Sequence, residues 1–170
     1  MDGGLSWIST DMSLTFSHLI DCKFFSADTG IIVGAYSGTG TGSKCRIAYT
    51  TNGGMSWQNV VSAADTAHLC WKINFVNRML GFVSVENELK QDSVFYYQTS
   101  DGGKTWELQS YYKNKSYGGQ GIGFIDEYTG WCGFQSGDTK MTTDGGKLWT
   151  DAPSILDNIN RFRKKSYYND

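Results

Sequence analysis

The chain has 170 residues, a formal net charge of −2 and 15% aromatic residues, with 21 glycines and one proline. The length suits one domain with a sizeable core, and the weak, interspersed charge argues against binding to nucleic acid or to an anionic membrane surface. No apolar run approaches the roughly 18 residues that span a bilayer, so we expect no membrane insertion. The first residues also lack the pattern of a signal peptide.

One turn motif recurs along the chain. Its copies are Asp2–Trp7, which is shortened, Thr50–Trp57, Thr99–Trp106 and Thr142–Trp149. Their tryptophans are 50, 49 and 43 residues apart. A nearly fixed spacing of this size indicates repeated supersecondary units, and four-stranded propeller blades lie near its upper limit.

The residues of the motif suit a tight hairpin. Each copy has an Asp-Gly or Asn-Gly pair, which tolerates positive φ, and the Asp or Asn side chain can accept backbone N–H groups within the turn. The tryptophan can fold back over the turn and fix it to the sheet. We therefore interpret these residues as structural, and not as catalytic carboxylates or calcium ligands: Asp2, Trp7, Asn52, Trp57, Asp101, Trp106, Asp144 and Trp149.

The pattern Ser/Thr-x-Asp-x-Gly-x-Thr-Trp resembles the Asp box, or BNR repeat, of sialidase-like and sortilin-type β-propellers. The wider repeat is most similar to the photosystem II assembly and stability factor type, including its bacterial relatives. The resemblance implies that the box joins the third and fourth strands of a blade, away from the central ligand face. Asn52 replaces Asp and Leu148 replaces Thr in this pattern.

In chain order, Trp7–Thr10 is expected to form the last strand of a preceding blade, within residues 1–10. The first full blade then covers residues 19–61. Alternating and β-branched residues favour strands, and the turn signals leave no room for a long helix. The expected strands of this blade are 19–25, 31–36, 45–50 and 56–61.

Two more blades are expected at residues 69–110 and 119–152. Their strands are expected at 69–76, 81–85, 93–99 and 105–110, then at 121–125, 130–134, 139–142 and Trp149. A second landmark has the same period, because a phenylalanine precedes a glycine by six residues in each blade. The pairs are Phe24 and Gly30, Phe75 and Gly81, and Phe124 and Gly130.

Residues 158–170 resemble the start of another blade or a tail. The sequence thus predicts one all-β domain over residues 1–170, a β-propeller segment of about three four-stranded antiparallel blades with Asp-box hairpins, incomplete at both ends. Closed rings usually have 4–8 blades, and an open stack leaves exposed sheet edges. We expect the chain to be a piece of a larger propeller or to close with another chain, including a second copy of itself.

The cysteines are Cys22, Cys45, Cys70 and Cys132. Without a C-x-x-C pair they do not indicate a zinc site. Two states stay open: buried free thiols, or a disulfide between Cys22 and Cys70, which lie near the first strands of successive blades.

Other catalytic readings are weak, and we expect no catalytic residue, cofactor or metal. The glycine-rich segment Ser37–Lys44 lacks the Gly-Lys-Ser/Thr and helix of a phosphate loop, so it is predicted to be an inter-strand loop. His18 and His68 have no evident triad partners. The sialidase pattern requires an arginine cluster, whereas the only arginines are Arg46, Arg78, Arg161 and Arg163.

Seven aromatic residues can either form a binding surface or pack between blades: Tyr96, Tyr97, Tyr111, Tyr112, Tyr117, Trp71 and Trp131. We assign most strand aromatics to the core. Tyr111 and Tyr112 are followed by Lys113 and Lys115 after a fourth strand, and exposed aromatics beside cations are typical of contact sites. These four residues are the candidate partner contact.

The function that fits these features is a non-enzymatic scaffold that binds or assembles proteins, in an extracytoplasmic setting implied by the resemblance alone. A fragment of a carbohydrate-active propeller, with its catalytic residues on other blades, is the alternative, and a glycan ligand stays open. A glycan array and a reporter-glycoside screen separate the two functions.

Overall fold

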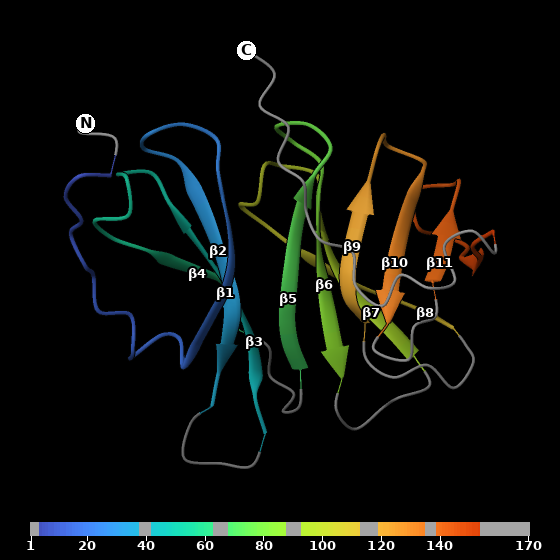
Figure 1. Cartoon of the computed structure of the whole chain (residues 1–170), viewed down its shortest axis with the longest axis horizontal. Coiled ribbons are helices and arrows are strands. Elements are labelled where there is room, and N and C mark those ends of the chain that lie inside the picture. Colours follow the sequence, from blue (N-terminus) through green and yellow to red (C-terminus); the bar gives the residue numbers. More distant parts are fainter. Residues whose placement is uncertain are drawn as a thin grey trace.

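The computed structural model describes residues 4–37, 42–62, 68–87, 93–112, 119–134 and 139–153. In these residues every regular element is a β-strand. The strands form three antiparallel sheets of four strands each, and each sheet uses strands that are consecutive in the chain. The sheets stand side by side like the segments of a fan (Figure 1). The predicted all-β class is therefore confirmed.

The strands follow the same order in each sheet. The first sheet contains β1 (His18–Phe24), β2 (Gly30–Tyr36), β3 (Lys44–Thr50) and β4 (Gln58–Ser62). The second contains β5 (His68–Phe75), β6 (Gly81–Asn87), β7 (Ser93–Thr99) and β8 (Glu107–Tyr112). The third contains β9 (Gly119–Phe124), β10 (Gly130–Phe134), β11 (Thr139–Thr142) and β12 (Thr150–Asp151).

Two expectations about strands are wrong. The fourth strands begin just after each motif tryptophan and not at Ser56, Thr105 or Trp149, because these residues still belong to the turn. The segment Trp7–Thr10 is not a strand. A strand needs a partner for its backbone groups, and none of the strands in the described residues pairs with this segment.

The phenylalanine and glycine of the second landmark face each other across the first hairpin of every sheet. Phe24 pairs with Gly30, Phe75 with Gly81 and Phe124 with Gly130. A Cβ atom at these glycines would lie within 2.6 Å of the phenylalanine ring. Glycine is therefore required because the ring lies directly over its Cα atom.

The first strands β1, β5 and β9 contact one another in succession and form the inner edge of the fan. Each has a register irregularity that begins four residues before its phenylalanine. It lies at Ile20 in β1, at Trp71 and Lys72 in β5, and at Gln120 in β9. Side chains also join these strands: Asp21 Oδ2 accepts the Ile73 N–H at 3.2 Å, and Asn74 Oδ1 accepts the Phe124 N–H at 3.0 Å. Neighbouring inner strands are thus linked without backbone pairing.

The interface between the first and second sheets is aliphatic and covalently linked. Ile31, Val33 and Ile47 pack there against Ile73 and Val83. A disulfide joins Cys45 on β3 to Cys70 on β5 across this interface.

The suggested Cys22–Cys70 disulfide is wrong, and the alternative of buried free thiols holds only for Cys132. Cys22 is an exposed thiol, and Cys132 is a buried one. Cys45 and Cys70 both point into the first interface, with their Cα atoms 5.0 Å apart, within the range for a disulfide.

The interface between the second and third sheets is aromatic. Phe82 stacks on Phe124 with ring centroids 3.8 Å apart, and Tyr96 and Trp149 complete the cluster. The opposite face of the first sheet is covered in part by the preceding segment, where Met12 and Phe16 pack on Ile32 and Ala48. Each sheet therefore has its own apolar packing partner.

Candidate functional site

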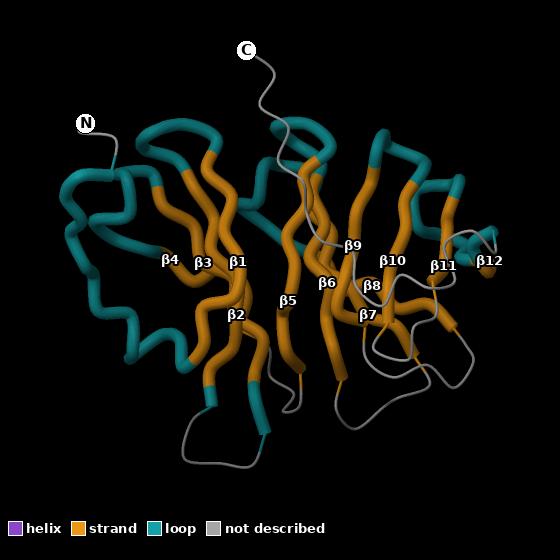
Figure 2. The backbone as a smooth tube through the Cα atoms, viewed as in Figure 1, coloured by secondary structure: helices purple, strands orange, loops and turns teal. Residues whose placement is uncertain are grey.

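The two ends of the sheets are built differently. At one end, which we call the motif end, each turn motif lies beside the turn that joins the first two strands of its sheet (Figure 2). Backbone hydrogen bonds fix this contact in every sheet, from Gly53 to Asp28, Gly102 to Met79 and Gly145 to Tyr128. At the other end, the loop end, second strands connect to third strands and each sheet connects to the next.

Asp101 shows how the side chains of the motif are used. Its Oδ1 accepts the hydroxyl of Thr99 and the N–H groups of Lys104 and Thr105, and its Oδ2 accepts the hydroxyl of Thr105 at 2.6 Å. Desolvation raises the pKa of this carboxyl, but the hydrogen bonds outweigh it and lower the pKa to about 2. The turn thus uses both oxygens of this carboxylate as hydrogen-bond acceptors.

The other two turns keep this arrangement with different partners. Asn52 Oδ1 accepts the Thr50 hydroxyl and the Ser56 N–H, so a neutral amide replaces the carboxylate. Asp144 accepts the Thr142 hydroxyl and the Leu148 N–H through Oδ1, and these bonds lower its pKa. Leu148 has no hydroxyl for Oδ2, unlike Thr105 in the second sheet.

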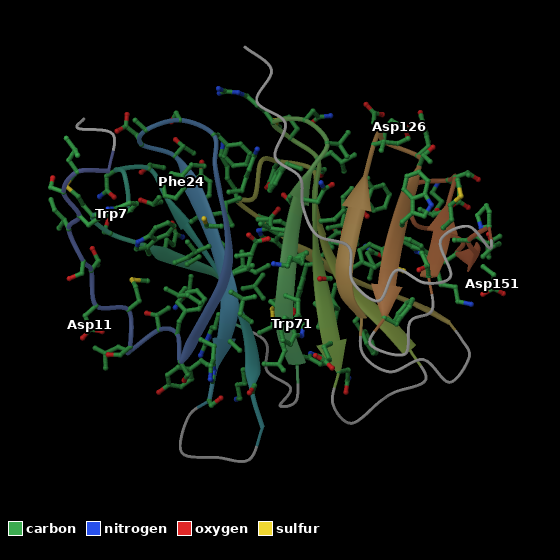
Figure 3. All side chains as sticks on the ribbon, viewed as in Figure 1. Trp7, Asp11, Phe24, Trp71, Asp126 and Asp151 are labelled. Atoms are coloured by element: carbon green, nitrogen blue, oxygen red, sulfur yellow. A yellow bond between two sulfur atoms is a disulfide. The ribbon has the colours of Figure 1, made fainter. Side chains whose placement is uncertain are left out.

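The motif tryptophans fold over the turn in all four copies, while Asp2 lies outside the described residues. The indole N–H of Trp106 donates to Gly103 O at 3.0 Å, and that of Trp149 to Gly146 O at 2.9 Å. Trp149 is buried, whereas Trp7 is 88% exposed and lies away from the sheets (Figure 3). The turn fold therefore does not depend on burial of its tryptophan.

The loop end contains polar contacts that the sequence did not reveal. Trp71 lies within the irregularity of β5 (Figure 3). Its indole donates to Glu86 Oε2 at 2.6 Å. The guanidinium carbon of Arg46 lies 5.5 Å from the centroid of the Tyr36 ring, and its Nε is buried without a hydrogen-bond partner. Only the cross-strand register, with Tyr36 opposite Lys44, would have placed Arg46 beside Tyr36.

The two histidines lie where the first strands of the first two sheets begin. His18 begins β1 and is exposed. His68 begins β5 and is buried, with Nε2 2.8 Å from Asn87 Nδ2 and its ring beside Phe95. His68 therefore helps to close the loop end of the second sheet.

The aromatic candidates for a binding surface differ in their burial and position. Tyr96 and Tyr97 are buried in the two interfaces, as the core interpretation expects. Tyr111 and Tyr112 end β8 at the loop end. Lys113 and Lys115, and also Tyr117, lie outside the described residues.

The candidate metal ligands and the arginines are dispersed in the described residues. They contain no cluster of three or more His, Cys, Asp or Glu residues that could hold a metal ion. Arg46 lies on β3 toward the loop end, whereas Arg78 lies at the motif end and donates to Phe25 O. Arg161 and Arg163 lie outside the described residues. No helix in the described residues is long and apolar enough to cross a membrane.

No family model and no curated protein matches the chain. Among solved structures it is similar to YCF48 bound to D1 peptide, with a TM-score of 0.60 and 19% sequence identity. The match covers 78% of this chain and 38% of that chain, so this chain spans less than half of the length of YCF48. The fold is therefore of the β-propeller type, and the three sheets are its blades.

Proposed function

We propose that the chain is a non-enzymatic, protein-binding scaffold whose partner contacts the loop end of the blades. The observation that carries this proposal is the use of the motif end by the fold: backbone hydrogen bonds tie each turn motif to the neighbouring turn of its blade, so we take the opposite end as the contact surface. The solved structure of YCF48 contains a D1 peptide, and this supports a peptide or protein ligand for the same fold.

The partner contact that we propose is formed by Tyr111, Tyr112, Lys113 and Lys115. Strand β8 ends at Tyr112, opposite the turn motif of its blade, so the segment begins at the loop end. Arg46 stacked on Tyr36 is a second cation and aromatic pair toward this end. Aromatic and arginine side chains are enriched in protein interfaces.

We also propose that the turns are Asp boxes and that the chain is related to the photosystem II assembly factor type of propeller. The repeated hydrogen bonds of Asn52, Asp101 and Asp144 and the folded-back tryptophans support this relation. By the same proposal, the binding partner of this chain is another protein or the remaining blades of a larger propeller.

An extracytoplasmic location belongs to the proposal as well. Disulfides persist in oxidising compartments and are rare in the cytosol. The buried Cys45–Cys70 bond is consistent with such a compartment.

The test is selection of binders from a phage library of random 12-residue peptides on the purified chain, with a panel of chromogenic glycosides beside it. We expect selected peptides to bind the wild-type chain and to lose about tenfold in affinity on Lys113→Glu/Lys115→Glu, as for contacts worth more than 1 kcal/mol. Lys104→Glu, an exposed lysine at the motif end, is the matched control. Glycoside hydrolysis, or peptides insensitive to the loop-end variant, would overturn the proposal.

A further inference from the structure

A polar groove of about 450 Å³ lies between the second and third blades at the motif end. Gln98 and Gln109 form the wall on the second blade, and Glu127, Tyr128 and Asp144 form the wall on the third. Tyr96 also lines the groove, and its hydroxyl donates to Gly146 O at 2.9 Å, which joins the two walls. Its volume is in the range of binding pockets for small ligands and side chains.

The groove exists because the second interface has polar residues at two positions where the first interface has larger or apolar ones. In the first blade, Tyr49 on β3 and Val61 on β4 pack into the apolar core between blades one and two. In the second blade, Gln98 takes the position of Tyr49. Gln109 takes the position of Val61, because Gln109 pairs with Tyr96 as Val61 pairs with Ile47 in the first blade. Two apolar residues that close the first interface are therefore replaced by two amides that leave the second one open.

The charge of the groove favours a cation. Glu127 and Asp144 contribute two carboxylates, and Lys147 is the one cation among the lining residues. The described hydrogen bonds of Asp144 end on Oδ1, because Leu148 lacks the hydroxyl that Thr105 gives to Oδ2 of Asp101. Oδ2 of Asp144 thus lacks the hydroxyl partner that Oδ2 of Asp101 has, and the pKa of Asp144 is lowered chiefly by the Leu148 N–H and in smaller part by the charge of Lys147.

The shape of the groove favours a planar cation. Tyr128 is 63% exposed at its rim and presents an aromatic ring, which attracts cations over its face. A guanidinium is planar, donates up to five hydrogen bonds and stacks on aromatic rings, whereas an ammonium is a compact point charge. The amide oxygens of Gln98 and Gln109 add neutral acceptors for the remaining N–H groups.

We propose that this groove binds the arginine side chain of an extended partner segment. The site lies at the motif end, so it is distinct from the loop-end contact and does not rest on it. Glu127 and Asp144 accept hydrogen bonds from the guanidinium, Tyr128 stacks on it, and the two glutamines fix its orientation.

The test is a titration of the ¹⁵N-labelled chain with Nα-acetyl-arginine methylamide, followed by amide chemical shifts. Saturable shifts are expected at Gly145 and Gly146 and at the side-chain amides of Gln98 and Gln109. Nα-acetyl-citrulline methylamide, which is nearly isosteric and neutral, should produce no such shifts. Shifts of equal size with both compounds, or none with the arginine derivative, would overturn the proposal. Shifts produced by N-acetylglucosamine alone would make the groove a sugar site and would overturn it as well.

Two variants separate binding from folding. Glu127→Gln should weaken the arginine derivative by about two- to fivefold, as for a partly exposed ion pair, while Asp28→Asn, in the corresponding turn of the first blade, should change nothing. Gln98→Tyr/Gln109→Val gives the second interface the residues of the first and should abolish binding. Binding unchanged in Glu127→Gln and in the double variant would refute the site. The loop-end variants do not touch the groove, so the two proposals fail independently.

Discussion

The two interfaces between the blades solve the same packing problem with different chemistry. The first is filled by aliphatic side chains, is linked by the Cys45–Cys70 disulfide, and is closed by Tyr49 and Trp106. The second is filled by the Phe82–Phe124 stack and Tyr96, and it opens into a polar groove. The turn motifs of the blades on either side of the two interfaces are nearly the same.

This contrast shows that the repeated turn motif determines the fold of each blade, while the side chains between blades can differ. Each turn is closed by hydrogen bonds within its own blade, so residues that face the next blade can change without breaking it. In repeat architectures, stability is approximately a sum of unit and nearest-neighbour terms. The predicted effects, from the largest to the smallest, concern contacts between blades in three cases and the hydrogen bonds of a single turn in the fourth.

The largest effect is expected for Phe82→Ala. Phe82 is fully buried and stacks on Phe124, so its removal leaves a cavity in the second interface. We expect a loss of about 3–5 kcal/mol in the free energy of unfolding, measured by urea denaturation. Phe24→Ala is the control. Phe24 is the first-blade counterpart of Phe124, but its side chain is 45% exposed. Equal losses in both variants would contradict stacking as the stabilising contact.

Removal of the disulfide should weaken the first interface. For Cys45→Ala/Cys70→Ala we expect a loss of about 2–4 kcal/mol, because the bond restricts the unfolded chain over a separation of 25 residues. Thermal unfolding of both proteins, with and without a reductant, measures this loss. Cys22→Ala removes an exposed thiol and should change stability by less than about 0.5 kcal/mol. A wild-type protein insensitive to reductant would argue against the bond.

Two glycine variants isolate the contact between blades at a turn. Gly54 and Gly103 have φ values of +86° and +89°, so alanine is strained equally at both. A Cβ at Gly103 would also lie 2.2 Å from Ile31 Cδ1 of the first blade, whereas at Gly54 it would meet only Trp57. Gly103→Ala should therefore cost about 1–3 kcal/mol more than Gly54→Ala. Equal melting temperatures of the two variants would show that the blades are not in contact there.

The smallest expected effect is on the pH dependence of stability, through Asp101, which has a neutral counterpart in Asn52 of the first blade. Despite desolvation, hydrogen bonds lower the pKa of Asp101 to about 2 in the folded chain, from its ordinary value of 3.8. The stabilisation by this carboxylate is therefore present above about pH 4 and is lost as the pH falls through 2. Asp101→Asn should remove this part of the acid sensitivity while keeping the fold, because Asn52 makes the corresponding bonds. Melting temperatures from pH 2 to pH 6 measure it. Parallel curves for the variant and the wild type would disprove it.

The blades were predictable because their signals are local. The Asp-Gly turns, the motif tryptophans and the Phe24–Gly30 spacing each depend on residues a few positions apart, and the structure places strands around all of them. The start of the fourth strands was not predictable, because it depends on how far the tryptophan folds back. The irregularity at Trp71 depends on pairing with β6, which has no local signature.

The candidate sites were less predictable, because they depend on contacts between blades. The Cys45–Cys70 pair joins a third strand to the first strand of the next sheet, so strand assignments alone do not select it. Gln98 reads as an ordinary strand residue until its alignment with Tyr49 shows that it faces the neighbouring blade. The exchange of Thr for Leu148 was visible in the sequence, but its effect on Asp144 needed the atomic geometry.

The side-chain links between inner strands have a consequence for engineering this molecule. Asp21 and Asn74 each accept an N–H group of the following inner strand, so in the first two blades a polar side chain helps to set the height of the next blade along the fan axis. A module cut from this chain and grafted elsewhere would keep its fold but lose its vertical alignment unless the preceding module supplied that acceptor. The natural unit for recombination is therefore a blade together with the acceptor on the strand before it.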